Sequence, residues 1–318
     1  MSWSPLMYNV LRDEKMLDVS LLGTGGMMPM PGRFLASMLL RLNGGMLLVD
    51  CGEGTQVTLK ILGWGFKSID CICFTHYHAD HISGLPGMLL TIGNSGRTER
   101  LTLMGPPGLK TVVEGLRRIV PELPFDIEYV ELSGGESLRV GEYNIRTLSV
   151  HHRIKCLAYR FDIKRAGRFS VEKAESLGLP KPLWSKLQKE GHAVYNGREY
   201  TGDMVLGEER RGISLSYCTD SRPGKDISAF VKDSDLFVCE GMYGEDEKMK
   251  KAEEYRHMIY SEAAALAKEG NVKKLWLTHF SPSLSDPYFY VDNARRIFPN
   301  TEIGRDRMCA SLGFAEEE

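Results

Sequence analysis

The sequence predicts an α/β fold in which two mixed β-sheets pack together and helices cover the outside. Short apolar, β-rich runs recur along the 318 residues, and segments of helical periodicity separate some of them. Hairpin-type turns such as Asn43-Gly44-Gly45 connect strands in the first half. The apolar share of 42% is ordinary for a globular protein, so a sizeable core is expected.

Apolar runs bounded by turn residues are expected to form the strands. They are Leu17–Leu22, Ser37–Leu42, Met46–Val49, Cys71–Phe74, Leu101–Met104, Ile145–Val150, Ile213–Cys218, Leu236–Cys239 and Leu275–Leu277. Pro107–Val120 has apolar residues at helical spacing and a proline near its start, which predicts a helix. Ser261–Glu269 is alanine-rich and predicts a second helix that ends at Gly270-Asn271.

One stretch, from about Lys164 to Gly207, is rich in lysine, glycine and proline and lacks a long apolar strand. It contains a short helical pattern at Val171–Leu177, a Pro180-Lys181-Pro182 step and a hairpin signal at Asn196-Gly197. We interpret residues 1–318 as a single domain with an inserted arm at about 164–207. An ordinary surface excursion is the alternative interpretation of this stretch.

Charge is distributed unevenly along the chain. The formal net charge is only −2, which by itself gives no reason to expect a nucleic-acid partner. Between Arg153 and Lys189, however, ten basic and three acidic residues give a balance of +7, which leaves −9 for the rest. Such a local excess of positive charge is typical of a phosphate-binding element.

The cysteines and the N-terminus indicate a cytoplasmic protein. The seven cysteines are an odd number, contain no CxxC pair and are expected to be reduced thiols. The first residues, Met1-Ser2-Trp3-Ser4-Pro5, lack the charged and then apolar pattern of a signal peptide. No apolar run approaches the roughly 18 residues of a membrane span, so no membrane partner is expected.

The strongest functional signal is Phe74-Thr75-His76-Tyr77-His78-Ala79-Asp80-His81, which follows an apolar strand. Three imidazoles and one carboxylate within six residues are costly to bury unless a cation balances them. His76 and His78 can lie on one side of an extended segment, and Asp80 and His81 can then reach a neighbouring position. The spacing therefore suits two metal ions.

Further candidate ligands follow other predicted strands, where α/β proteins assemble their sites. His152 follows Ile145–Val150, Asp220 follows Ile213–Cys218, and His279 follows Leu275–Leu277. Only one of His151 and His152 can face the site on an extended chain, and His152 is the one we expect there.

A series of short motifs extends this pattern across nearly the whole chain. They are Leu22-Gly23-Thr24-Gly25, Asp50-Cys51-Gly52-Glu53-Gly54-Thr55-Gln56, Gly84-Leu85-Pro86-Gly87, Gly105-Pro106-Pro107-Gly108-Leu109, His152-Arg153-Ile154, Tyr217-Cys218-Thr219-Asp220-Ser221-Arg222-Pro223 and Leu277-Thr278-His279-Phe280-Ser281. Together with HxHxDH, the series resembles the ribonuclease Z family of the metallo-β-lactamase superfamily. The resemblance implies a metallo-β-lactamase-like αββα sandwich.

The resemblance also implies a ligand set. One metal would be held by His76, His78 and His152. The other would be held by Asp80, His81 and His279, with Asp220 bridging. Imidazole and carboxylate ligands suit Zn²⁺, with Mn²⁺ or Fe as alternatives. Asp50 is implied to be a carboxylate that orients a histidine ligand.

The implied reaction is endonucleolytic removal of the 3′ trailer from precursor tRNA by water that the metals activate. Asp80 would accept a proton, and His257 would be the general acid or a phosphate ligand, with Glu240 hydrogen-bonded to it. The family's arm binds tRNA. The matching basic residues here, expected to contact backbone phosphates, are Lys164, Arg165, Arg168, Lys181 and Lys186. A homodimer is implied as well.

Departures from the family pattern, among them an unusually Met-rich loop at Met27–Met30, leave the substrate open. The arm has Pro180-Lys181-Pro182 where a Gly-Pro pair is usual, Cys239-Glu240-Gly241-Met242 replaces His-Glu-Ala-Thr, and Arg256 replaces a glycine before His257. A phosphodiesterase or esterase acting on a small molecule is the main alternative. A nucleic-acid-binding protein with a structural metal is disfavoured because structural zinc sites are usually rich in thiolates.

Overall fold

The computed structural model describes residues 16–120 and 122–314. Residues 1–15, on which the prediction of no signal peptide rests, lie outside the described residues. The chain divides into two compact units. The first unit runs up to Asp162 and resumes from Ile213 to Gly313, and the second unit contains Ile163–Gly212.

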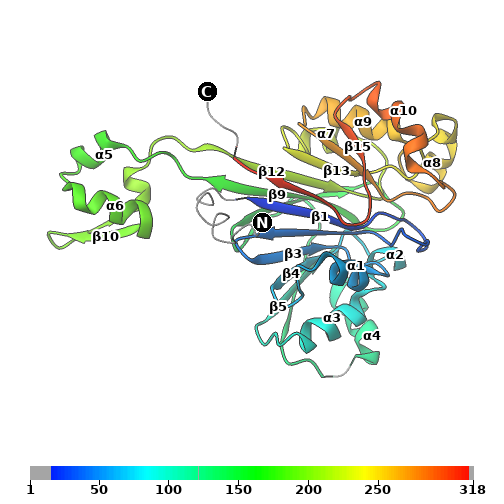
Figure 1. Cartoon of the computed structure of the whole chain (residues 1–318), viewed down its shortest axis with the longest axis horizontal. Coiled ribbons are helices and arrows are strands. Elements are labelled where there is room, and N and C mark those ends of the chain that lie inside the picture. The colour runs from blue at the N-terminus through cyan, green and yellow to red at the C-terminus, as the bar shows by residue number, and fades with distance from the viewer. Residues whose placement is uncertain (1–15, 121, 315–318) are drawn as a thin grey trace, which may run out of the picture. The chain divides into compact units, whose positions relative to one another are not determined.

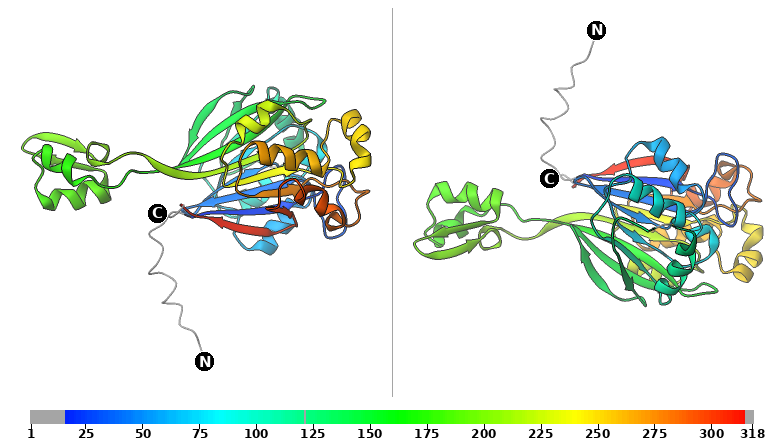
Figure 2. Two further views of the ribbon diagram at one scale, coloured as in Figure 1. Left: turned by 90° about the horizontal axis from the view of Figure 1, so that it is seen from above. Right: turned by 90° about the horizontal axis from the view of Figure 1, so that it is seen from below.

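The first unit contains two mixed seven-stranded sheets (Figure 1). The first sheet has the order β16 (Met308–Leu312), β1 (Leu17–Gly23), β2 (Ser37–Leu42), β3 (Gly45–Val49), β4 (Ile69–Cys73), β5 (Leu101–Gly105) and β6 (Ile127–Glu131). Pairing is antiparallel from β16 to β3 and parallel from β3 to β6. Figure 2 shows the C-terminal strand β16, in red, beside β1, in blue.

The second sheet has the order β15 (Thr301–Ile303), β14 (Leu275–Thr278), β13 (Leu236–Glu240), β12 (Arg210–Cys218), β9 (Cys156–Arg165), β8 (Tyr143–Val150) and β7 (Ser137–Val140). Strands β12 to β15 are parallel, whereas β7 and β8 form an antiparallel hairpin. Because parallel strands end at the same edge, residues that follow β12 and β14 come close together.

Helices cover the outer face of each sheet (Figure 1). On the first sheet these are α1 (Thr55–Leu62), α3 (Leu85–Asn94) and α4 (Leu109–Leu116). On the second they are α7 (Lys225–Phe230), α9 (Tyr260–Glu269) and α10 (Val291–Arg295). The short helices are α2 (Ala79–Ile82), α8 (Met249–Tyr255) and the 3-10 turns η2 (Arg117–Ile119), η4 (Asp246–Lys248) and η5 (Pro287–Tyr290). The predicted αββα sandwich of two mixed sheets is therefore confirmed.

The second unit has a small core of its own. It comprises α5 (Val171–Ser176), α6 (Lys181–Glu190), β10 (His192–Tyr195), β11 (Arg198–Thr201) and η3 (Gly202–Val205). Its buried residues are Ala174, Leu179, Leu187, Ala193, Tyr200 and Val205. The predicted hairpin is present, since Asn196 (φ 49°) and Gly197 (φ 73°) take the left-handed conformation of a tight turn.

The sequence did not predict helix α6. No structure was predicted for the Pro180-Lys181-Pro182 step, in which Pro180 is the residue before the helix and Pro182 lies in its first turn. Proline is tolerated there because a first-turn N–H has no partner inside the helix. The predicted helix Pro107–Val120 is shorter and consists of α4 followed by η2. None of the helices in residues 16–120 and 122–314 has the length and apolar character that crossing a bilayer requires.

Candidate metal centre

The histidine-rich segment leaves the end of β4 and enters α2. His76 and His81 are fully buried, Asp80 is 8% exposed, and His78 lies between buried and exposed. The Asp50 carboxylate fixes the turn, because its Oδ1 accepts the backbone N–H of Thr75 at 2.8 Å. The buried Asp50 carboxylate, at the end of the neighbouring strand β3, thus fixes the backbone directly before His76.

The three other predicted ligands come from strand ends of the second sheet. His152 follows β8, Asp220 follows β12 and His279 follows β14. Asp220 (φ 43°) and His279 (φ 59°) both take left-handed backbone conformations, as does Asp50 (φ 56°). Such conformations are unfavourable for residues other than glycine and cluster at functional sites.

The first group of donor atoms contains His76, His78, His152 and Asp220, all within 4.8 Å of one another. His78 Nδ1 lies 2.9 Å from His76 Nε2 and 3.3 Å from His152 Nε2. The Oδ2 atom of Asp220 is 3.7 Å from the same nitrogens of His76 and His152.

The second group contains Asp80, His81 and His279. His279 Nε2 lies 3.1 Å from His81 Nε2 and 3.3 Å from Asp80 Oδ2. The other oxygen of Asp220, Oδ1, is 3.2 Å from both imidazole nitrogens. The two oxygens of Asp220 therefore face two different donor groups.

The donor atoms fit divalent cations. Tetrahedral coordination at zinc-like bond lengths separates ligand atoms by about 3.3 Å, close to the spacings in both groups. Asp220 Oδ1 is buried and has no hydrogen-bond partner among the described residues. Burial lowers the pKa of the His76, His78 and His152 imidazoles, which favours the neutral form that binds metal.

Hydrogen bonds orient the imidazoles. His81 Nδ1 lies 2.8 Å from Asp50 Oδ2, so its Nε2 is directed toward Asp80 and Asp220. His152 Nδ1 lies 3.3 Å from the carbonyl oxygen of Arg256, which leaves its Nε2 for the first group. Both histidines thus direct their Nε2 atoms toward the other donor atoms of the cluster.

His257 lies beside the cluster and pairs with Glu240. Its Nδ1 is 3.0 Å from Glu240 Oε2 and 3.9 Å from Asp220 Oδ2. Burial lowers the pKa of His257, but the charge and hydrogen bond of Glu240 outweigh it and raise the pKa to about 9. Asp220, His257 and His279 also lie close enough to form a third donor group, but Glu240 occupies His257 Nδ1.

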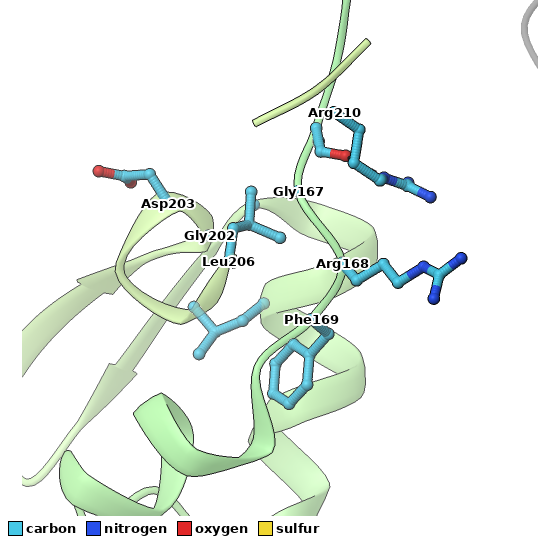
Figure 3. Close-up of a pocket in the computed structure, with 10 residues that line it drawn as sticks. Gly167, Arg168, Phe169, Gly202, Asp203, Leu206 and Arg210 are labelled. Atoms are coloured by element: carbon cyan, nitrogen blue, oxygen red, sulfur yellow. The ribbon is translucent and has the colours of Figure 1, made fainter. Parts of the chain in front are cut away.

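His151 and the predicted basic residues lie outside the donor groups. His151 is exposed and outside the donor groups, whereas His152 is inside. The predicted basic residues all belong to the second unit, where Lys164 forms an ion pair with Glu209 at 3.1 Å. Arg168 lines a cavity of about 520 Å³ in that unit, and Figure 3 shows the side chains of Arg168 and Arg210 extending to the same side.

Two interactions of the site had no signal in the sequence. The backbone N–H of Met27 donates to Asp80 Oδ2 at 2.7 Å. Arg256, in a left-handed conformation (φ 60°), donates from its guanidinium to the His152 carbonyl at 2.6 Å and presents its own carbonyl to the His152 ring. Neither interaction could be predicted, because both depend on chain segments that meet only in the fold.

A cavity of about 410 Å³ opens onto the donor cluster. It is lined by Met27, His78, Asp80, His152, Arg153, Asp220, Met242, Tyr243, Lys251, Tyr255, His257 and Ser281. A substrate in this cavity would meet both donor groups and His257.

Solved structures share this fold. The human tRNase Z, short form, superposes with a TM-score of 0.65 and 23% identity, covering 92% of this chain and 98% of that one. The metallo-β-lactamase fold protein YhfI from Bacillus subtilis gives a TM-score of 0.66 and 18% identity, covering 94% and 100%. Fold and donor cluster together define a protein of the metallo-β-lactamase fold with a site that could hold divalent metal ions.

Sequence relatives identify the family within that class. The family model of the anti-Pycsar protein Apyc1 matches residues 17–161, less than half of the chain. A ribonuclease Z from Clostridium kluyveri is 56% identical over 303 residues, which cover 95% of this chain and 100% of that protein. The chain belongs to the ribonuclease Z family.

Proposed function

We propose that this chain is an endoribonuclease that removes the 3′ trailer from precursor tRNA with two divalent metal ions, of which Zn²⁺ is the expected kind. The observation that carries the proposal is the Asp220 carboxylate, whose Oδ2 faces His76 and His152 while its Oδ1 faces His81 and His279. One carboxylate shared between two donor groups would hold two metal ions close together, as in two-metal phosphodiesterases. Membership of the ribonuclease Z family supports tRNA as the substrate.

The ligands follow from the two donor groups. His76, His78 and His152 would hold one ion, Asp80, His81 and His279 the other, and Asp220 would bridge them. Bound metal ions would lower the pKa of water and stabilise negative charge on the phosphoryl oxygens. Asp50 would keep His81 oriented, since it accepts a hydrogen bond from His81 Nδ1.

Proton transfer is assigned to Asp80 and His257. Burial opposes ionisation of Asp80, but the hydrogen bond and charge of His279 and the charge of His81 lower its pKa. Asp80 is therefore ionised at neutral pH and able both to bind a cation and to accept a proton. The pair with Glu240 keeps His257 protonated, so it can donate a proton to the leaving oxygen of the RNA.

The second unit would bind the body of the tRNA. The cations we assign to this role are the half-buried Arg165 and the exposed Lys164, Arg168, Lys181 and Lys186, which would contact backbone phosphates without reading sequence. We further propose a single hydrolase domain over 1–318, in which residues 164–207 form the RNA-binding arm, and a homodimer in which each arm serves the partner's site. A cytoplasmic location fits the thiols, since Cys71 and Cys73 are unbonded and 3.8 Å apart.

The test combines metal analysis with mapping of the cleavage position. The purified protein should contain two zinc ions per chain and cut a precursor tRNA directly after the discriminator nucleotide. Hydrolysis of bis(p-nitrophenyl) phosphate without any cut in precursor tRNA would instead favour the small-molecule phosphodiesterase. A single tightly held ion without hydrolysis of either substrate would favour a structural metal.

A further inference from the structure

Two cations on the wall of the metal-site cavity have no role in the mechanism described above. Arg153 directly follows the ligand His152, and Lys251 lies in α8, far along the chain. Both residues are exposed and both line the cavity. Arg153 donates one guanidinium N–H to the carbonyl oxygen of Glu254 at 3.0 Å. The ammonium group of Lys251 has no hydrogen bond and no ion pair among the described residues.

Aromatic rings in the same wall hold these cations in place. The guanidinium carbon of Arg153 lies 4.9 Å from the centre of the Tyr255 ring. Lys251 Nζ lies 5.3 Å from the centre of the Tyr243 ring, and Tyr243 is only 3% exposed. Cation–π contacts orient a charge without neutralising it. The two charges are therefore positioned before any ligand arrives.

The charge of the cavity favours an anion at this wall. Its lining carboxylates, within the described part of the chain, are Asp80 and Asp220, both of which are proposed metal ligands. Two divalent ions would more than cancel their charge, whereas Arg153 and Lys251 would remain uncompensated. A planar guanidinium and a compact ammonium that line the same cavity suit the oxygens of a phosphate.

We propose that Arg153 and Lys251 form a subsite for a second backbone phosphate of the RNA, next to the phosphate that is cleaved. The inference rests on the proposed function, because an RNA substrate places a further backbone phosphate next to the one that is cleaved. The subsite fixes the register of the RNA relative to the metal ions. A substrate with a single phosphate gains nothing from it.

The test uses nucleotides that are not phosphodiesters and so cannot be cleaved. Adenosine 3′,5′-bisphosphate carries two neighbouring phosphates, and the 5′- and 3′-monophosphates carry one. Calorimetry on the metal-loaded protein should show tighter binding of the bisphosphate than of either monophosphate. Lys251→Ala should weaken bisphosphate binding about tenfold, which is the change expected for removal of a charge-assisted hydrogen bond. The affinity for the tighter-binding monophosphate should stay unchanged.

Neighbouring residues supply matched controls. Lys250 is exposed, adjacent in α8 and absent from the cavity lining, so Lys250→Ala should leave both affinities unchanged. Tyr255→Phe should keep bisphosphate binding because the ring remains, whereas Tyr255→Leu should weaken it. Metal content should stay constant in all four variants.

Equal binding of bisphosphate and monophosphates by the unmodified protein would overturn the subsite. So would equal weakening in the Lys250 and Lys251 variants. Failure of the unmodified protein to cut precursor tRNA would refute the proposed function instead, and the calorimetric comparison does not depend on that cleavage.

Discussion

The metal centre and the second unit carry their functional side chains in opposite ways. In the metal centre, the donors are largely buried, come from several separate strand ends, and are fixed by hydrogen bonds such as that from Thr75 to Asp50. In the second unit, four of the five proposed phosphate-binding cations are exposed, as Lys164 is with 74% of its side chain exposed. The first arrangement depends on the position of each atom, and the second on total charge. Single substitutions should therefore cause large losses of activity in the metal centre and small losses in the second unit.

The steepest effect is expected at Asp220, because both donor groups share its carboxylate. Asp220→Ala should lose both metal ions and lower phosphodiester hydrolysis by more than about 10⁴-fold, since neither water activation nor charge stabilisation remains. Elemental analysis and a bis(p-nitrophenyl) phosphate assay measure these effects. Asp292→Ala, which removes an exposed carboxylate in α10, is the control and should change neither. Two ions retained in the Asp220 variant would contradict a bridging role.

A smaller effect is expected at His257, which lies beside the cluster but is already paired with Glu240. His257→Ala should lower the turnover of precursor tRNA by roughly 10²–10⁴-fold, as for removal of a general acid, with metal content unchanged. His192→Ala, which removes an exposed histidine of the second unit, should have little effect on turnover. Loss of metal in the His257 variant would show that this residue is a ligand.

Acidification should release metal from the centre by protonating its imidazoles. Burial lowers the pKa of His78 and His152 from the ordinary value of 6.5, so the neutral, metal-binding form persists to lower pH than in a free imidazole. Metal affinity of the group formed by His76, His78 and His152 should therefore hold at pH 6.5 and fall only below it, by up to about tenfold per pH unit for each imidazole protonated. In the other group burial lowers the pKa of His81, but the charge of Asp220 outweighs it and raises that pKa, so this group should lose metal at higher pH. Zinc affinity measured in a competition titration across this range gives the profile. A steep decline already above pH 6.5 in the affinity of the group formed by His76, His78 and His152 would contradict the effect of burial.

The smallest effects are expected in the second unit. Lys181→Ala combined with Lys186→Ala should raise KM for precursor tRNA a few-fold, leave kcat unchanged and reduce the salt slope of binding by about two, one for each lysine removed. Hydrolysis of bis(p-nitrophenyl) phosphate should not change. Lys60→Ala combined with Lys110→Ala removes two exposed lysines of the first unit and serves as the control. Equal effects of both pairs would indicate that only net charge matters.

The same contrast explains what the sequence could predict. The His76–His81 segment and the candidate ligands His152 and His279 could be proposed from the sequence because ligand-type residues follow apolar strands, which is a local signal. Helix α6 was not predicted, because prolines are rare inside helices and here they stand at its start. Strands β7 and β16 were missed because their residues alternate between exposed and half-buried positions at sheet edges. The wall formed by Lys251 and Tyr243 has no sequence signal, since only tertiary packing brings it to the cavity.

The most direct test is a crystal structure of the protein grown with zinc, with anomalous diffraction recorded at the zinc edge. Our account predicts two anomalous peaks, one among His76, His78 and His152 and the other among Asp80, His81 and His279, with the Asp220 carboxylate between them. A single peak, or a second peak coordinated by His257 in place of Asp80, would contradict it.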